Sequence, residues 1–123
     1  MEDFSKIWRI YRRGGDILEI NLEVIGVNLL VKLHGEIDHH TSGEIREAID
    51  RKIGSGGIKN LIFDFSGVTF MDSSGVGLII GRYKQIKLRG GRTMIVQARP
   101  NVERLMEITG IKKIIDTNED IAI

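Results

Sequence analysis

The chain has 123 residues, of which 41% are hydrophobic, and 18 basic against 17 acidic side chains give a formal net charge of +1. This length suits one compact domain, and the balanced charge gives no reason to expect a nucleic acid or an anionic membrane as partner. Cysteine is absent, which excludes disulfides and thiolate metal sites, and no apolar stretch approaches the roughly 20 residues of a membrane span, so we expect a cytoplasmic protein.

The first 16 residues stand apart from the rest of the chain. Their apolar side chains permit either a helix or a short strand, and the sequence leaves both open. Residues 12–15, Arg-Arg-Gly-Gly, resemble a linker. We therefore predict an N-terminal extension or linker over 1–16, loosely packed or disordered, and a single domain over 17–123.

Two strands are predicted next. Between Leu18 and Val24, apolar residues alternate with polar ones, as in a strand with one buried face. Residues 25–28 resemble a turn, and the apolar run 29–33 indicates a second strand. Because the connection is so short, the two strands are predicted to pair as an antiparallel hairpin.

A helix and a parallel strand should follow the hairpin. Thr41 and Glu44 match a capping box, and a glycine-rich segment over 54–57 stops the predicted helix. One helical face is apolar and carries Ile45, Ala48, Ile49 and Ile53. The apolar run 61–65 is the next strand, and a right-handed crossover through the helix would place it parallel to strand 29–33.

The same unit recurs towards the C-terminus. A helix is expected over 74–89, a strand over 93–96 and a third helix over 100–109. Just before and within the first of these helices, Phe70 is expected in the core and Arg82 on the solvent face. Residues 114–115 are expected to form a last short strand, and Asn118 to cap a helix that the chain is too short to complete. These elements predict an α/β domain with a mostly parallel sheet, one antiparallel edge strand and helices packed on the sheet.

Two loops are expected to meet at one edge of this sheet. In parallel sheets, functional groups gather at the carboxyl ends of the strands, because the loops there share an edge. One loop, residues 34–41, contains Asp38, and the other ends in Asp72-Ser73-Ser74. We expect Asp38 and Asp72 to flank the two serines.

Ser73 and Ser74 fall in the first turn of the helix predicted to follow strand 61–65. A helix exposes unpaired N–H groups and a partial positive charge at this end. Gly75 and Gly77 are small enough to leave the two hydroxyls uncovered. A serine held in this way is accessible to another protein.

Two catalytic interpretations of this edge have little support in the sequence. A metal-dependent hydrolase needs more ligands than are present, since the chain has only three histidines. Serine catalysis by Ser73 or Ser74 lacks the Gly-x-Ser-x-Gly elbow. The candidate metal ligands are His34, Asp38, His39, His40 and Asp72.

Two binding interpretations remain. The glycines at 75, 77 and 81 match neither a Walker loop nor the dinucleotide fingerprint, although a helix N-terminus is compatible with weak anion or nucleotide binding. The other interpretation is a binding module in which Ser73 is a phosphorylation switch. A phosphate would add about −1.5 to −2 charges at an edge that already holds Asp72, and would oppose a docked partner without unfolding the domain.

The segments 35–41, Gly-Glu-Ile-Asp-His-His-Thr, and 70–87, which begins Phe-Met-Asp-Ser-Ser-Gly-Val-Gly, resemble the anti-sigma factor antagonists of the STAS domain family, most closely its sporulation members. The resemblance covers about residues 18–115. It implies a bacterial partner-switching regulator that is not an enzyme and needs no cofactor. The unphosphorylated form would bind a serine-kinase anti-sigma factor and free the sigma factor. The kinase would then phosphorylate the antagonist with ATP, and a serine phosphatase would restore it.

The resemblance also implies roles for single residues. Ser73, directly after Met-Asp, matches the phosphoacceptor, and Asp38 matches a residue that would meet the kinase through an arginine. Val76 and Gly77 match positions of the same interface on the exposed start of the helix. The full expected partner-binding set is Asp38, Asp72, Ser73, Ser74, Gly75, Val76 and Gly77. The alternative is a stand-alone STAS module that senses a nucleotide or another anion.

Overall fold

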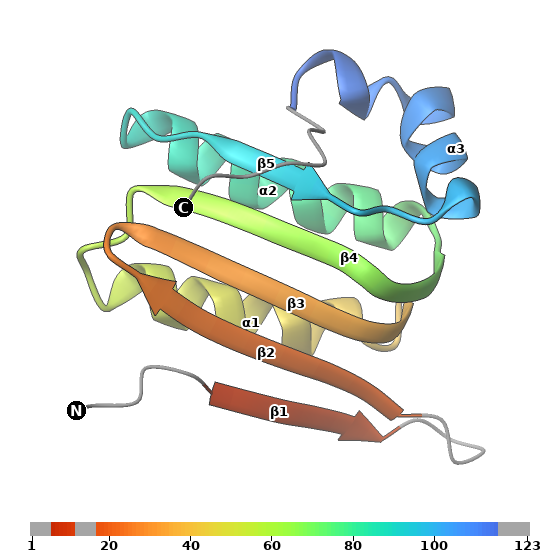
Figure 1. Ribbon diagram of the computed structural model, residues 1–123, viewed down its shortest axis with the longest axis horizontal. Helices are drawn as coiled ribbons and strands as arrows, with labels where there is room; N and C mark the ends of the chain where they lie inside the picture. Colours follow the sequence, from red (N-terminus) through yellow and green to blue (C-terminus); the bar gives the residue numbers. More distant parts are fainter. Residues whose placement is uncertain (1–5, 12–16, 116–123) are drawn as a thin grey trace.

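The computed structural model describes residues 6–11 and 17–115. The sheet has five strands, and Figure 1 shows helices packed against it. The elements in chain order are β1 (Lys6–Tyr11), β2 (Ile17–Ile25), β3 (Asn28–Ile37), α1 (Ser42–Gly54), β4 (Asn60–Met71), α2 (Ser73–Leu88), β5 (Thr93–Val96), α3 (Pro100–Thr109) and the 3-10 helix η1 (Ile111–Lys113).

The strands lie in the order β1-β2-β3-β4-β5. β2 and β3 form the predicted antiparallel hairpin, and β3 and β4 are parallel, as the crossover through α1 requires. β4 and β5 are also parallel, whereas β1 pairs antiparallel with β2. The α/β class is confirmed. The sheet was expected to be mostly parallel with one antiparallel edge strand, but it has two antiparallel and two parallel pairings because β1 joins it.

β1 is the first difference from the sequence prediction. Its residues pair with β2 from Lys6 opposite Leu22 to Tyr11 opposite Ile17, so the strand alternative is the correct one. Ile10 belongs to the buried core, and loose packing of this segment is therefore wrong for residues 6–11. The expected linker over 12–15 and the Asn118 cap lie outside the described residues, and the domain boundary at residue 17 stays a prediction.

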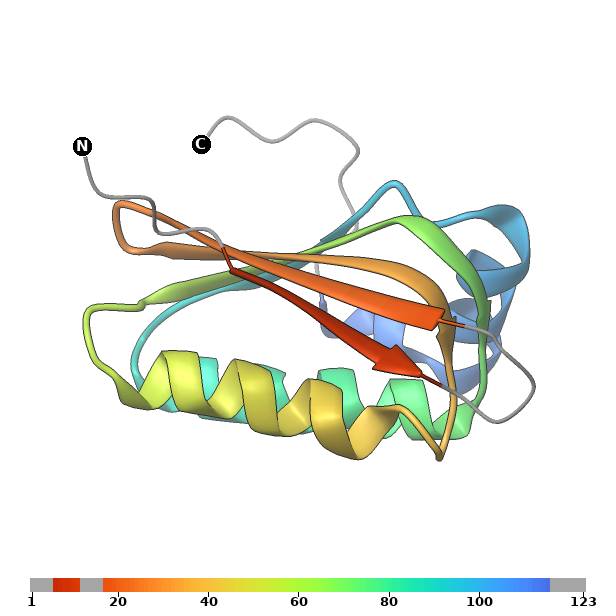
Figure 2. The ribbon, with the colours of Figure 1, turned by 90° about the horizontal axis from the view of Figure 1, so that it is seen from below.

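The core lies between the sheet and two helices. Figures 1 and 2 show α1 and α2 on the same face of the sheet, and the two helices contact each other. The apolar face predicted for α1 is confirmed, since all four of its residues are buried. The largest fully buried side chains include Leu18, Ile20, Leu22, Leu29, Leu33, Ile45, Ile49, Ile53, Leu61, Phe63 and Phe65.

β4 is longer than the predicted strand, which ended at Phe65. The Ser66-Gly67 pair resembles a turn in sequence, yet the strand continues through it to Met71. A Cβ at Gly67 would lie 2.2 Å from Nδ1 of His34 on β3. Glycine thus allows a close approach of two neighbouring strands here, next to a register shift in the β3–β4 pairing.

The short strand expected at 114–115 is wrong. α3 ends at Gly110, whose positive φ of 79° turns the chain directly into η1. Ile111 and Ile115 are both buried while Ile114 is exposed, so these apolar residues follow a helical spacing of four. None of the described helices is long and apolar enough to cross a membrane.

Candidate partner-binding site

The loops after β3 and β4 meet at one edge of the sheet, as predicted. Ile37 and Met71 are the last paired residues of the two strands. The backbone N–H of Asp72 donates to the carbonyl oxygen of Ile37 at 3.1 Å, which ties the start of α2 to the end of β3. Asp38 and Asp72 therefore follow two adjacent strand ends.

Asp72 is the N-cap of α2. Its Oδ1 accepts a hydrogen bond from the backbone N–H of Ser74 at 2.8 Å, and its carbonyl oxygen accepts one from Gly75 at 3.0 Å. One of the otherwise unpaired N–H groups of the first turn is thereby satisfied. The cap determines that α2 begins at Ser73, directly after the carboxylate.

Ser73 is exposed on the first turn of α2. Its hydroxyl makes no hydrogen bond to any other described residue, and the positive end of the helix dipole lies beside it. Ser74 is half-buried and faces α1. Of the two serines, Ser73 is therefore the one whose hydroxyl is open to an approaching protein.

Asp38 follows the strand end next to that of Asp72, but its side chain has a local partner. The residue is only 6% exposed, and its Oδ1 accepts hydrogen bonds from the backbone N–H groups of His40 at 2.9 Å and Thr41 at 3.2 Å. The carboxylate thus holds its own loop in an Asx turn. Any contact of Asp38 with a partner would be made from this anchored position.

The capping box predicted for Thr41 and Glu44 is wrong. Thr41 is fully buried and makes no side-chain cap. Its hydroxyl accepts from the backbone N–H of Asp38 at 3.0 Å and donates to the carbonyl oxygen of Glu36 at 3.1 Å. The folded loop brings these two backbone groups nearer to the hydroxyl than the helix N–H groups, and Glu44 stays exposed.

Of the three residues after the serines, Gly75 and Val76 are buried and Gly77 is exposed. Gly75 is buried, and a Cβ there would lie 2.3 Å from Cγ of Met71. Val76 is 6% exposed and belongs to the core, so its expected place on the exposed start of the helix is wrong. The helix turns Val76 and Ile79 towards the sheet and Gly77 away from it, with open space around its Cα.

Two side chains near the site differ from the sequence prediction. Phe70, expected in the core, is 45% exposed, because Met71 takes the inward position at the end of β4. Arg82, expected on the solvent face of α2, is buried with its Nε 2.9 Å from Oδ1 of Asp50 on α1. In the sequence, only the strand alternation at 70–71 could have predicted the outward position of Phe70. No local pattern predicts that Arg82 pairs with Asp50, because the two residues lie on different helices.

Residues 19–122 match the family model of the STAS domain. The chain belongs to the STAS domain family. Among its relatives is the "Anti-sigma F factor antagonist" of Paenibacillus polymyxa, which is 39% identical over 97 residues, 79% of this chain and 83% of that protein.

Two solved structures of SpoIIAA resemble this STAS domain. The anti-sigma factor antagonist SpoIIAA in its unphosphorylated form superimposes with a TM-score of 0.73 at 32% identity, covering 82% of this chain and 89% of that one. The Bacillus cell fate determinant SpoIIAA in the phosphorylated form gives a TM-score of 0.66 at 31% identity, covering 82% and 92%. The STAS fold expected from the sequence is confirmed.

The catalytic interpretations gain no support from this STAS domain. Within residues 6–11 and 17–115, no group of three or more histidine, aspartate or glutamate side chains is arranged to hold a metal ion. His39 and His40 are exposed, and their rings contact each other at a centroid distance of 3.8 Å with an interplanar angle of 40°. No hydrogen bond joins a described histidine to Ser73, so a serine–base pair is not formed there.

Proposed function

We propose that this STAS domain is an anti-sigma factor antagonist that works as a phosphorylation switch and not as an enzyme. Its unphosphorylated form binds a serine-kinase anti-sigma factor in the bacterial cytoplasm and so releases the sigma factor. The observation that carries this proposal is the exposed hydroxyl of Ser73 at the N-terminus of α2. The curated relatives named as anti-sigma factor antagonists support the same assignment.

Phosphorylation of Ser73 would change the surface and spare the fold. The phosphate brings about −1.5 to −2 charges, which the positive end of the α2 dipole favours. The hydroxyl is outside the core, so no packed side chain has to move. A partner docked on this edge would face phosphate bulk and negative charge beside Asp72, and binding would be lost.

The expected partner-binding residues act in two ways under this proposal. Ser73, Ser74 and Gly77 offer atoms that a partner can touch. The others set the shape behind them: Asp72 caps α2, Asp38 holds the adjacent loop, and Gly75 and Val76 pack the helix on the sheet. The exposed ring of Phe70, next to this edge, is a further contact candidate, since aromatic side chains are enriched among binding hot spots.

Phosphorylation by the cognate anti-sigma factor kinase tests the proposal. The purified kinase and ATP should add one phosphate, which mass spectrometry places on Ser73, and Ser74→Ala is the control for position, because it should still accept a single phosphate on Ser73. A serine phosphatase should remove this phosphate. Phosphate found at another residue alone would refute the assignment.

The binding side of the switch needs its own measurement. Ser73→Ala should bind the kinase as tightly as the unmodified protein, whereas Ser73→Asp should bind about tenfold or more weakly, because it places a charge at the docked surface. Equal affinities of the two variants would contradict the electrostatic mechanism. Calorimetry with ATP and GTP in the absence of the kinase tests the alternative, a nucleotide-sensing module.

A further inference from the structure

A groove runs between α1 and α2 and starts beside the phosphoacceptor. It encloses about 300 Å³ and is lined by Ser42, Arg46, Ser74, Gly77, Leu78 and Arg82. Ser74 is the neighbour of Ser73, and Gly77 lies one turn further along α2. A protein that covers Ser73 and Gly77 would therefore also cover this groove, which we call the α1–α2 groove.

The α1–α2 groove carries more positive than negative charge. Arg82 is buried and forms an ion pair with Asp50, whose Oδ1 lies 2.9 Å from its Nε without hydrogen-bond geometry. Arg46 is exposed, lines the same groove and makes no ion pair with a described residue. Two guanidinium groups thus line the groove, and Asp50 forms an ion pair with only one of them.

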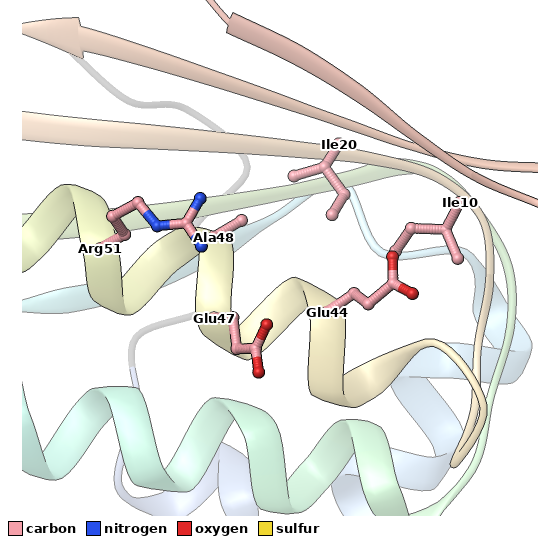
Figure 3. A pocket seen from close by; sticks show the side chains of 6 residues that line it. All are labelled: Ile10, Ile20, Glu44, Glu47, Ala48 and Arg51. Atoms are coloured by element: carbon pink, nitrogen blue, oxygen red, sulfur yellow. The ribbon is translucent and has the colours of Figure 1, made fainter.

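Arg46 and Arg82 are close enough to influence each other. Burial lowers the pKa of the Arg82 guanidinium, Asp50 opposes this effect, and the positive charge of Arg46 lowers the pKa further. The acidic residues Glu44 and Glu47 of α1 line a different hollow, together with Ile10 and Ile20 of the sheet (Figure 3). The groove is therefore suited to an additional negative charge.

The lining favours a carboxylate over a larger ligand. Guanidinium groups bind carboxylates through paired N–H donors, and the hydroxyls of Ser42 and Ser74 can donate to the same oxygens. Gly77 leaves open space over the groove, and Leu78 forms an apolar wall for the methylene groups of an acidic side chain. The volume lies at the lower end of the range for small-molecule pockets, about 300–1,000 Å³.

We propose that the α1–α2 groove receives an aspartate or glutamate side chain of the kinase partner, with Arg46 as its principal contact. This inference rests on the proposed function, because the occupant is the protein that reaches Ser73. It extends the docking surface from the strand ends across α2 to α1. Arg82, held by Asp50, supplies the positive charge at the base of the groove, and Arg46 closes over the bound carboxylate.

Charge reversal at Arg46 tests this docking site. Arg46→Glu would place a carboxylate of this chain beside Arg82, where the partner's carboxylate is expected to bind. Arg51→Glu is the matched control: it makes the same charge change at another exposed residue of α1, but Arg51 lines the hollow near Ile10 (Figure 3). Both substitutions are made in a Ser73→Ala background, so that phosphorylation does not alter binding, and circular dichroism checks that each variant is folded.

The affinity for the purified kinase decides the outcome. Arg46→Glu should weaken binding about tenfold or more and reduce its salt dependence, while Arg51→Glu should change the affinity by less than about twofold. If Arg46→Glu fails to fold, Arg46→Gln serves in its place, with a smaller loss of affinity expected.

Failure of this inference is distinguishable from failure of the proposed function. Equal affinities of the Arg46 and Arg51 variants, with Ser73 still phosphorylated in the wild type, would overturn the groove assignment alone. So would calorimetric binding of inorganic phosphate that depends on Arg46 while kinase affinity does not, because the groove would then be a site for small anions. A kinase that neither binds nor phosphorylates the wild type would remove both proposals.

Discussion

The starts of α1 and α2 have similar residues and opposite properties. Each helix follows a parallel strand of the sheet, and each start combines an aspartate with a hydroxyl group. Before α1, Asp38 and Thr41 are buried and hydrogen-bonded within their own loop. At α2, Asp72 caps the helix and the hydroxyl of Ser73 is left exposed.

The difference comes from the position of the hydroxyl relative to the cap. Thr41 precedes the first helical residue, where the loop folds back and offers the backbone groups of Glu36 and Asp38. Ser73 is already the first residue of α2, so its side chain projects from the helix and the cap role belongs to Asp72. A hydroxyl on the residue before the helix is thus bonded within its loop, whereas a hydroxyl on the first helical residue is exposed to an approaching protein.

The largest difference in stability is expected between two glycines of the α2 start. Gly75→Ala should lower the free energy of unfolding by about 2–3 kcal/mol, because the new Cβ would overlap the side chain of Met71. Gly77→Ala should raise it by up to about 1 kcal/mol, since the space there is open and alanine favours the helix. Urea unfolding measures both, and similar changes in the two variants would contradict the inward and outward orientations.

Removing the hydroxyl of Thr41 or of Ser73 should give a smaller difference in the free energy of unfolding. Thr41→Val should cost about 2 kcal/mol, because the substitution keeps the shape but leaves the N–H of Asp38 and the carbonyl of Glu36 without their partner. Ser73→Ala should change stability by less than about 0.5 kcal/mol, as for most exposed positions. Thermal unfolding of both variants measures the two losses of stability. A larger loss in Ser73→Ala than in Thr41→Val would contradict the structural role of Thr41 and the free position of Ser73.

The cap of α2 should give the smallest of these effects. Asp72→Ala is expected to cost about 1 kcal/mol, since the N–H of Ser74 loses its acceptor. Asp72→Asn keeps an oxygen in place and should cost only a few tenths of a kcal/mol, because asparagine caps nearly as well. Chemical denaturation of the two variants separates the capping role from the charge, and a large loss in Asp72→Asn would show that the charge matters more.

Much of the fold follows from short-range patterns in the sequence. The alternation over 18–24, the helical face of α1 and the glycines that end the helices depend on neighbours within a few residues. They predicted the hairpin, the crossover and the meeting of the β3 and β4 loops. The Met-Asp-Ser motif, through its family resemblance, indicates Ser73 from the sequence alone.

Only the tertiary structure decided which side chains are covered. β1 became an edge strand because β2 offered it hydrogen-bonding groups, and Arg82 became buried because α1 placed Asp50 against it. Asp38 turned into its loop, while Phe70 turned outwards at the end of β4. These outcomes depend on contacts between residues far apart in the chain, and periodicity and capping carry no information about such contacts.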